Sequence, residues 1–252
     1  MEIHKLDEDE RVPAAEHNRS ALKITAIKPA VKNENRVNIF VNEEYVFSLD
    51  LAQVIDYKIK VGKNLSPEEL DELKHASEFG KLYQRTLEWV LTRPHSEKET
   101  RDYLRHKRQK RETENRQAIR NRERSKEERE KYKLKTKELP LFSDDDIEKI
   151  ITRLIEKGYL NDYEFAKYFL ENRNARKGTS TKRLKLELVK KGISQATIDE
   201  LLNENLRTDE EEIQKIIAKK RQKYDDEKLV QYLARQGFSY DLIRSALNQQ
   251  ES

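Results

Sequence analysis

The carboxyl-terminal part of the chain repeats one helical pattern three times, and this repeat limits the fold more than any other feature. Each copy has a serine, an isoleucine four residues later, and apolar residues three and four positions beyond the isoleucine. Such a serine is typical of a helix N-cap, and the i, i+3, i+4 apolar set is typical of a buried helix stripe. The copies begin at Ser143, Ser194 and Ser239, which lie 51 and 45 residues apart. This period predicts tandem helical units that pack mainly against their neighbours.

Two further helices are predicted upstream of each repeated one. The first helix of each copy is predicted over residues 82–91, 163–171 and 211–221. The second begins at equivalent caps, eight residues before a leucine, at Ser96, Ser180 and Asp225. Glycines follow predicted helix ends, where a left-handed residue is expected; they are Gly158, Gly192 and Gly237. Each copy is therefore expected to be a three-helix unit.

The amino-terminal part has the period of β-strands instead. Apolar residues alternate over 37–41 and again over 45–49, on either side of the Asn42-Glu43-Glu44 link, which predicts a hairpin. A further strand is predicted where apolar residues alternate before Pro29. Ser66-Pro67-Glu68-Glu69 then has the N-cap, first-turn proline and capping-box glutamate of a helix start. A small sheet is expected here.

The predicted fold is mainly α-helical, with three tandem three-helix repeats in an elongated body, preceded by a small N-terminal segment that contains a β-hairpin. Residues 1–20 have little apolar content and predict a mobile tail. The other predicted divisions are a β-rich segment over 21–66, a first unit over 67–160 with a charged insertion at 105–138, a second unit over 161–206 and a third over 207–252.

Basic residues are concentrated in two blocks of a chain that carries 52 basic and 48 acidic side chains. One block, from Arg173 to Lys191, surrounds the Ser180 cap, and a helix start also attracts anions through its backbone N–H groups. Basic blocks on a neutral background are typical of contact with a polyanion or an acidic protein surface. The primary candidates for this contact are Arg173, Arg176, Lys177, Lys182, Arg183, Lys185, Lys190 and Lys191.

The second basic block is the insertion, which has too few apolar residues to form a coiled-coil seam. Oppositely charged residues at i, i+4, such as Glu112 with Arg116 and Glu127 with Lys131, predict a solvated helical arm or hairpin. A purely solvating role and a binding role are both open for it. Its candidate residues are Lys107, Arg108, Lys110, Arg111, Arg120, Arg122 and Arg124.

Catalytic, metal and cofactor sites are not expected. The chain has no cysteine, and its glycines are too far apart for a nucleotide-binding loop. The five histidines include no HxxxH pair, and the three aspartates after Ser143 are better explained as a helix cap than as metal ligands. Without a long apolar run or a basic, apolar leader, we expect a cytoplasmic protein that is neither exported nor bound to a membrane.

The order of a short β-containing segment and three three-helix units resembles the bacterial RecX regulators. Three phrases contribute to this resemblance: Arg-Pro-His-Ser-Glu-Lys-Glu (93–99), Glu-Lys-Gly-Tyr-Leu-Asn-Asp (156–162) and Lys-Lys-Gly-Ile-Ser (190–194). The resemblance implies a monomeric non-enzyme that binds the RecA recombinase filament on single-stranded DNA. It also implies inhibition of filament growth, ATP hydrolysis and strand exchange, and a role in DNA recombination, DNA repair and the SOS response. The insertion departs from the compact first unit that is usual in this family.

A helical protein that binds DNA directly is the alternative. Three-helix units with glycine-containing turns are similar to helix-turn-helix domains. However, the last helix of the first unit opens with three aspartates, and that of the second carries Asp199 and Glu200 without a basic residue. Sequence-specific reading of a major groove is therefore disfavoured. Sequence-independent contact with DNA phosphates, weak in the protein alone, stays compatible with either class.

Overall fold

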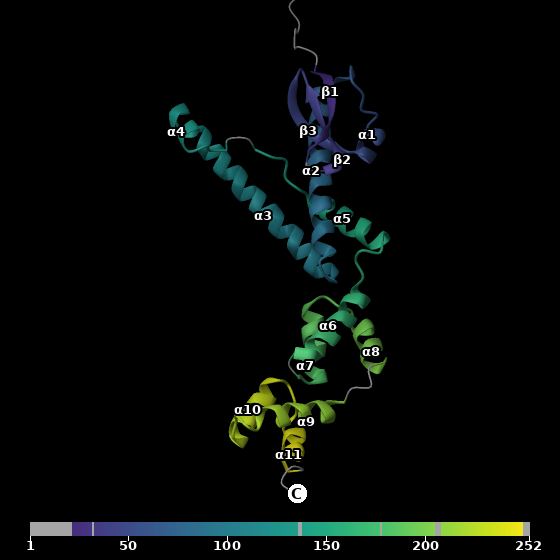
Figure 1. The fold of residues 1–252 in the computed structure, drawn as a ribbon, viewed down its shortest axis with the longest axis vertical. Helices are drawn as coiled ribbons and strands as arrows, with labels where there is room; N and C mark the ends of the chain where they lie inside the picture. Colours follow the sequence, from purple (N-terminus) through teal and green to yellow (C-terminus); the bar gives the residue numbers. More distant parts are fainter. Residues whose placement is uncertain (1–21, 32, 136–137, 177, 205–207, 249–252) are drawn as a thin grey trace, which may run out of the picture. The chain divides into compact units, whose positions relative to one another are not determined.

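The computed structural model describes residues 22–31, 33–135, 138–176, 178–204 and 208–248 (Figure 1). The predicted tail over 1–20 lies outside these ranges. The chain divides into two compact units after Gly80, and the described residues form eleven helices and a four-stranded sheet. The protein is therefore mainly α-helical with a small strand segment on its amino-terminal side, as predicted. Among the helices of these ranges, none combines the length and apolar character that crossing a membrane requires.

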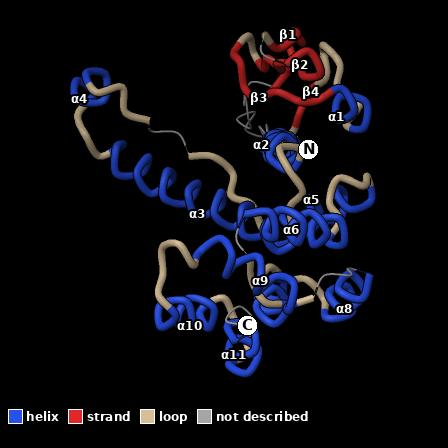
Figure 2. Tube along the Cα trace, turned by 60° about the horizontal axis from the view of Figure 1, so that its bottom comes forward, coloured by secondary structure: helices blue, strands red, loops and turns tan. Residues whose placement is uncertain are grey.

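The sheet of the first unit is antiparallel, with the order β3-β2-β1-β4 (red in Figure 2). Its strands are β1 (Leu22–Ala30), β2 (Asn33–Val41), β3 (Glu44–Asp50) and β4 (Asn64–Leu65). The β2–β3 turn has two residues, Asn42 and Glu43, with φ values of 48° and 71°. Positive φ at both central positions is the geometry of a type I′ turn, which matches strand twist. Glu44, which the sequence assigned to the link, is the first residue of β3 and pairs with Val41.

The core of the first unit lies between this sheet and the beginning of a long helix. Ile24, Ile39 and Leu49 are fully buried in it, together with Leu73 of α2 (Pro67–Val90). A short helix, α1 (Leu51–Asp56), follows β3 directly. The helix start predicted at Ser66 is confirmed, but the helix predicted over 82–91 is the second half of α2. Gly80 lies inside α2 and does not end the helix. An added Cβ at this position would lie 3.0 Å from the side-chain oxygen of Gln53.

The rest of the chain forms the helices of the second unit. The first repeat has α3 (Glu97–Arg122) and α5 (Asp144–Glu156), with the short α4 (Lys126–Lys131) between them. The second repeat has α6 (Asp162–Arg176), α7 (Thr181–Lys190) and α8 (Gln195–Glu204). The third has α9 (Asp209–Lys220), α10 (Asp226–Arg235) and α11 (Tyr240–Asn248).

The apolar stripe predicted from the repeat is buried in every copy. Ile147, Ile198 and Ile243 are each at most 1% exposed. The second and third repeats each have their own hydrophobic core, one built from α6, α7 and α8 and the other from α9, α10 and α11. The predicted N-caps are also confirmed, since the hydroxyls of Ser143, Ser194 and Ser239 each accept a hydrogen bond from the backbone N–H three residues later.

The first and second repeats meet where the N-cap of α3 docks on the carboxyl end of α7. Ser96 Oγ donates a hydrogen bond to the carbonyl of Lys191 (2.8 Å), and Lys98 Nζ donates to the carbonyl of Lys190 (2.8 Å). The backbone N–H of Glu97 donates to the carboxylate of Asp162 at the start of α6 (2.8 Å). Three backbone groups at helix ends therefore find their partners in the neighbouring repeat.

The second and third repeats meet through an equivalent set of contacts. Thr179 Oγ1 and the N–H of Ser180 donate to the carbonyl of Gln236, at 3.0 and 3.1 Å. The guanidinium of Arg183 donates to the carbonyl of Arg235, and the N–H of Thr181 donates to the carboxylate of Asp209 (2.8 Å). The repeated sequence pattern thus encodes the contact between neighbouring repeats as well as the helices within each one.

The glycine that follows the second helix of a repeat is required by both backbone and space. Gly192 and Gly237 have φ values of 88° and 92°. An added Cβ would lie 2.7 Å from Lys98 Cβ at Gly192 and 2.5 Å from Ser180 Oγ at Gly237. Gly158 has a φ of 72°, but no atom lies within 4 Å of an added Cβ there. Only the first two glycines are therefore also closed to a side chain by the neighbouring repeat.

We expect Gly237→Ala to lower the free energy of unfolding more than Gly158→Ala does. Left-handed backbone costs an L-residue about 1–2 kcal/mol at either position. The clash at Gly237 should add about 1–3 kcal/mol, because the repeats must move apart to admit the methyl group. Denaturant unfolding of both variants measures this difference. Equal losses would show that the junction tolerates a side chain.

Candidate functional site

The basic block of the second repeat is organised by α7. Ser180 caps this helix by accepting a hydrogen bond from the N–H of Arg183 (3.2 Å). Leu184 and Leu188 point into the core of the repeat and are at most 1% exposed. A four-residue spacing places both leucines on the buried face of the helix, so side chains on the opposite face point away from the core. The outer face of α7 exposes Lys182, Leu186, Val189 and Lys190.

Three of the predicted cations are held by partners inside the protein. Lys185 forms an ion pair with Asp199 of α8 (2.8 Å), and Lys191 forms one with Glu99 of α3 (2.6 Å). Arg183 pairs with Glu187 (3.1 Å) in addition to its bond across the junction. These side chains link helices to one another, which the sequence did not indicate.

The start of the predicted basic block differs from the expectation. A loop was predicted over 174–179, but α6 continues to Arg176, so Arg173 and Arg176 belong to its last turn. Helix continues here because the segment contains no glycine or proline before Gly178. Lys177 lies outside the described residues. The loop before α7 is therefore shorter than predicted.

A groove between α7 and α10 collects the groups that stay available. Its lining includes Lys182, Leu186, Glu187 and Lys190 of α7, Arg235 at the end of α10, and Phe238 after that helix. Leu186 is 55% exposed, and Val189 beside it is 49% exposed. The side chains of Lys182 and Lys190 make no ion pair within the part of the chain that the structure describes. The groove thus combines free positive charge with an exposed apolar surface.

Sequence reasoning missed two kinds of residue in this groove. Arg235 was overlooked because it belongs to the next repeat and comes to α7 only through the junction. Leu186 and Val189 were overlooked although a signal was present. They are apolar residues that lie off the Leu184/Leu188 stripe, and an apolar residue outside the buried face of an amphipathic helix indicates a possible contact surface.

The basic residues of the insertion fall into two groups, of which the first packs on its own repeat. Arg108 pairs with Asp144 (2.8 Å), and Arg111 lies over the ring of Phe142, 5.2 Å from its centroid. Lys107 lies over the ring of Tyr103 (4.8 Å). Arg108 and Arg111 attach the middle of α3 to α5 and its approach, whereas Lys107 contacts a ring of its own helix. They are stabilising contacts of the first repeat.

The rest of the insertion forms a single long helix with an extended return segment. Asn115 bonds to both the N–H and the carbonyl of Leu139 (3.0 and 2.7 Å), and Asn121 Nδ2 donates to the carbonyl of Lys135 (2.8 Å). Arg122 pairs with Glu138 of the same segment (2.8 Å). The described part of the arm therefore consists of the end of α3 and the short α4, followed by a segment that is bonded back to α3.

The i, i+4 ion pairs predicted for the arm do not form. Arg116 Nε donates to the backbone carbonyl of Glu112 (3.4 Å) and not to its carboxylate. No ion pair joins Glu127 to Lys131 either, both of which the structure describes. Exposed pairs of this kind are weak, so side-chain entropy and solvent compete with them. Lys110, Arg120 and Arg124 are exposed.

A buried polar cluster lies at the junction of the first two repeats, but its chemistry is structural. His95 is 3% exposed, and its Nδ1 lies 3.2 Å from the carboxylate of Glu99. Burial lowers the pKa of His95, and the charge of Arg93 lowers it further. Burial raises the pKa of Glu99, but the hydrogen bonds and charges of Lys191 and Arg93 outweigh this and lower it overall. The cluster is thus a neutral imidazole beside an ionised carboxylate that holds Lys191.

The acidic run after Ser143 is a helix cap, as predicted. The hydroxyl of Ser143 and the carboxylate of Asp146 form a capping box, and Asp144 and Asp145 pair with Arg108 and Lys149. No cluster of histidine, aspartate and glutamate suited to holding a metal ion occurs among the residues with described positions.

The fold and this surface define a class: a helical-repeat protein that carries a small β-sheet segment and a basic, partly apolar groove. Comparison with known proteins identifies the family. Residues 22–66 match the regulatory protein RecX N-terminal domain, and residues 161–202 match the RecX second three-helix domain. The chain belongs to the RecX family.

Similar proteins of this family cover most of the chain. The regulatory protein RecX of Bacillus velezensis is 32% identical over 238 residues, which span 90% of this chain and 77% of the relative. That of Bacillus subtilis is 30% identical over 237 residues, with the same coverage. A crystal structure of a regulatory protein RecX superposes with a TM-score of 0.62 at 18% identity, over 90% of this chain and 99% of that one. The last comparison supports the fold alone.

Proposed function

We propose that this protein regulates homologous recombination by binding the RecA filament on single-stranded DNA, where it inhibits filament extension, ATP hydrolysis and strand exchange. Its place in the RecX family, whose similar members are named regulatory proteins, is the observation on which this proposal rests. It acts in the cytoplasm as a monomer without a catalytic residue or cofactor, within DNA repair and the SOS response.

The groove between α7 and α10 supports this function through its chemistry. A filament on DNA offers both protein surface and phosphate charge, so a complementary surface needs apolar area and cations together. Leu186 and Val189 supply exposed apolar area, while Lys182 and Lys190 flank it with charge that no described residue neutralises. Apolar side chains at the centre of a patch with charged groups around it are the usual arrangement of a protein interface.

Inhibition of RecA by the whole protein tests the proposal. We expect substoichiometric amounts to lower the single-stranded-DNA-dependent ATP hydrolysis of RecA, because a ligand that contacts several filament subunits affects more than one active site. A pull-down with RecA, with and without single-stranded DNA and a slowly hydrolysed ATP analogue, shows whether the filament is the target. Unchanged ATP hydrolysis at equimolar protein would refute the proposed function.

Direct, sequence-independent binding to DNA is the second candidate function. The unpaired arginines of the arm favour it, because they do not belong to the groove between α7 and α10. The two functions are compatible, since a protein can hold a filament through one surface and bare nucleic acid through another.

A further inference from the structure

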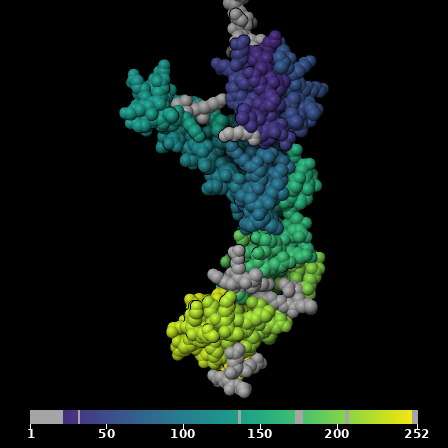
Figure 3. Space-filling model, viewed as in Figure 1, coloured from purple at the N-terminus to yellow at the C-terminus, as the bar shows by residue number. Residues whose placement is uncertain are grey.

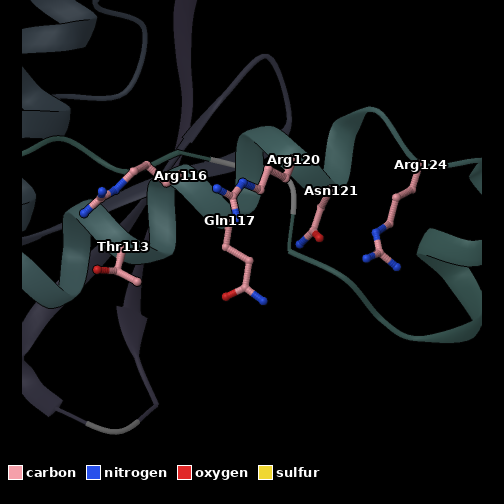
Figure 4. A pocket seen from close by; sticks show the side chains of 6 residues that line it. All are labelled: Thr113, Arg116, Gln117, Arg120, Asn121 and Arg124. Atoms are coloured by element: carbon pink, nitrogen blue, oxygen red, sulfur yellow. The ribbon is translucent and has the colours of Figure 1, made fainter.

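We propose that the distal half of α3 is a second binding site, which takes the phosphodiester backbone of a nucleic acid without reading its sequence. The site consists of Arg116, Arg120 and Arg124, together with Thr113, Gln117 and Asn121 (Figure 4). We call it the arginine row. It rests on the second proposed function, direct binding to DNA, and does not depend on inhibition of RecA, because bare nucleic acid suffices as its ligand.

The geometry of the arginine row suits a linear polyanion. The three arginines are spaced by four residues, so their Cα atoms rise by about 6 Å per step and span about 12 Å along one side of the helix. Together the six side chains line a recess of about 400 Å³. A single inorganic phosphate would occupy only one position of such a row, whereas a phosphodiester chain carries one negative charge per nucleotide and can contact all three.

The cations of the arginine row are available, unlike most of their neighbours. Within the part of the chain with described positions, the guanidinium groups of Arg120 and Arg124 make no ion pair or hydrogen bond. Arg116 bonds only to a backbone carbonyl of its own helix. By contrast, Arg108 and Arg122 are paired with Asp144 and Glu138. None of the six side chains that line the recess is acidic.

The kinds of residue in the row favour nucleic acid over an acidic protein. A guanidinium presents a planar fork of N–H groups that matches the oxygens of a phosphate, and amide and hydroxyl groups add hydrogen bonds to the backbone. Protein interfaces usually have an apolar centre, yet no apolar side chain lines this recess. No aromatic ring lines it either, so bases have no aromatic platform to stack on, and binding should depend little on sequence.

The arginine row lies on the half of α3 that leads into α4. In the space-filling view, the end of α3 and α4 are drawn in teal (Figure 3). The return segment is bonded to Asn115 and Asn121, so it holds the arm helix at two points. A helix supported in this way keeps its three arginines in line before a ligand arrives, which lowers the entropy lost on binding.

Salt dependence of binding tests the site in the full-length protein without RecA. The probes are fluorescein-labelled oligothymidylate and a duplex of mixed sequence, followed by fluorescence anisotropy. In the variant R116Q/R120Q/R124Q, we expect the slope of log K against log salt to fall by about 2 for the single strand, at about 0.7 for each lost phosphate contact. The variant K110Q/K126Q/K135Q is the control, because it removes three exposed charges from the same arm outside the row.

The control variant should change the slope by less than about 0.7, which is the change expected for one lost phosphate contact. Equal losses in the two variants, or no loss in the arginine variant, would overturn the proposal. So would a matching loss of binding to polyglutamate, which would show an unselective anion surface, or equally effective competition by inorganic phosphate. The variant R116K/R120K/R124K keeps the charge and should restore most of the slope, which guards against a folding defect. Because RecA is absent, these results do not depend on whether RecA is inhibited.

Discussion

Replacing the exposed face of α7 is expected to remove inhibition of RecA while the helices stay folded. The variant Lys182→Gln, Leu186→Ser, Lys190→Gln changes three side chains that point away from the core of the repeat. Burying a leucine in an interface contributes about 1.5–3 kcal/mol, and each cation opposite an acidic group or phosphate contributes about 1 kcal/mol more. The combined loss of about 3–5 kcal/mol predicts an affinity for the filament that is reduced more than 100-fold.

A matched variant separates the role of this surface from the change in charge. Lys167 and Lys219 are exposed lysines of the second and third repeats, and Ile155 is an exposed apolar residue that is 41% accessible. The control Lys167→Gln, Lys219→Gln, Ile155→Ser therefore changes the same residue types elsewhere. ATP hydrolysis by RecA and circular dichroism should be measured for both variants. Equal loss of inhibition in both would mean that the groove between α7 and α10 has no special role.

Shortening the arm is expected to preserve all three repeats and most of the inhibition. The side chain of Asn115 bonds to both backbone groups of Leu139, so these two positions already lie side by side. A short glycine-serine link can therefore replace residues 116–138 and leave Arg108 and Arg111 on the first repeat. We expect the free energy of unfolding to change by less than about 1 kcal/mol, because the removed residues make few buried contacts.

A longer deletion should behave differently. Removing residues 107–137 also removes the ion pair of Arg108 with Asp144 and the contact of Arg111 with the ring of Phe142. Loss of both should cost about 0.5–3 kcal/mol, since a cation–π contact contributes about 0.5–2 kcal/mol and an exposed ion pair up to about 1 kcal/mol. Thermal unfolding of the two deletions compares them directly. If the short deletion abolishes inhibition while the α7 variant acts like the unmodified protein, the arm is the functional surface and the two sites were ranked wrongly.

The fold of this protein and its candidate binding surfaces depend on different residues. The three-helix repeats follow from local pattern, whereas the surface that meets a partner depends on which side chains stay free. The proposals above concern two such surfaces, the groove between α7 and α10 and the arginine row of α3. Each can be changed without touching the cores that the repeat pattern encodes.

Local patterns in the sequence were enough to predict most elements of this protein and their order, although they did not indicate α1 and β4. N-caps such as Ser143, stripe residues such as Ile198 and left-handed glycines such as Gly237 act on residues a few positions away, so a local pattern is enough to identify them. The same local reasoning indicated the hairpin and the helical arm. It also excluded nucleotide-binding loops and cysteine chemistry, which require residues that the chain does not contain.

Which charged residues are available to another molecule depends on the tertiary structure and could not be predicted from the sequence. Lys191 forms an ion pair with Glu99, which is 92 residues away along the chain, and Lys185 forms one with Asp199. Lys182, which belongs to the same basic block, stays exposed. Arg235 joins the groove through the next repeat, and Arg116 lacks the acidic partner that its spacing predicts. Long charged side chains form ion pairs with whichever acidic residues the packing of helices brings near, and these residues can be far away in the sequence. Helix caps and apolar stripes have their partners within the same few turns.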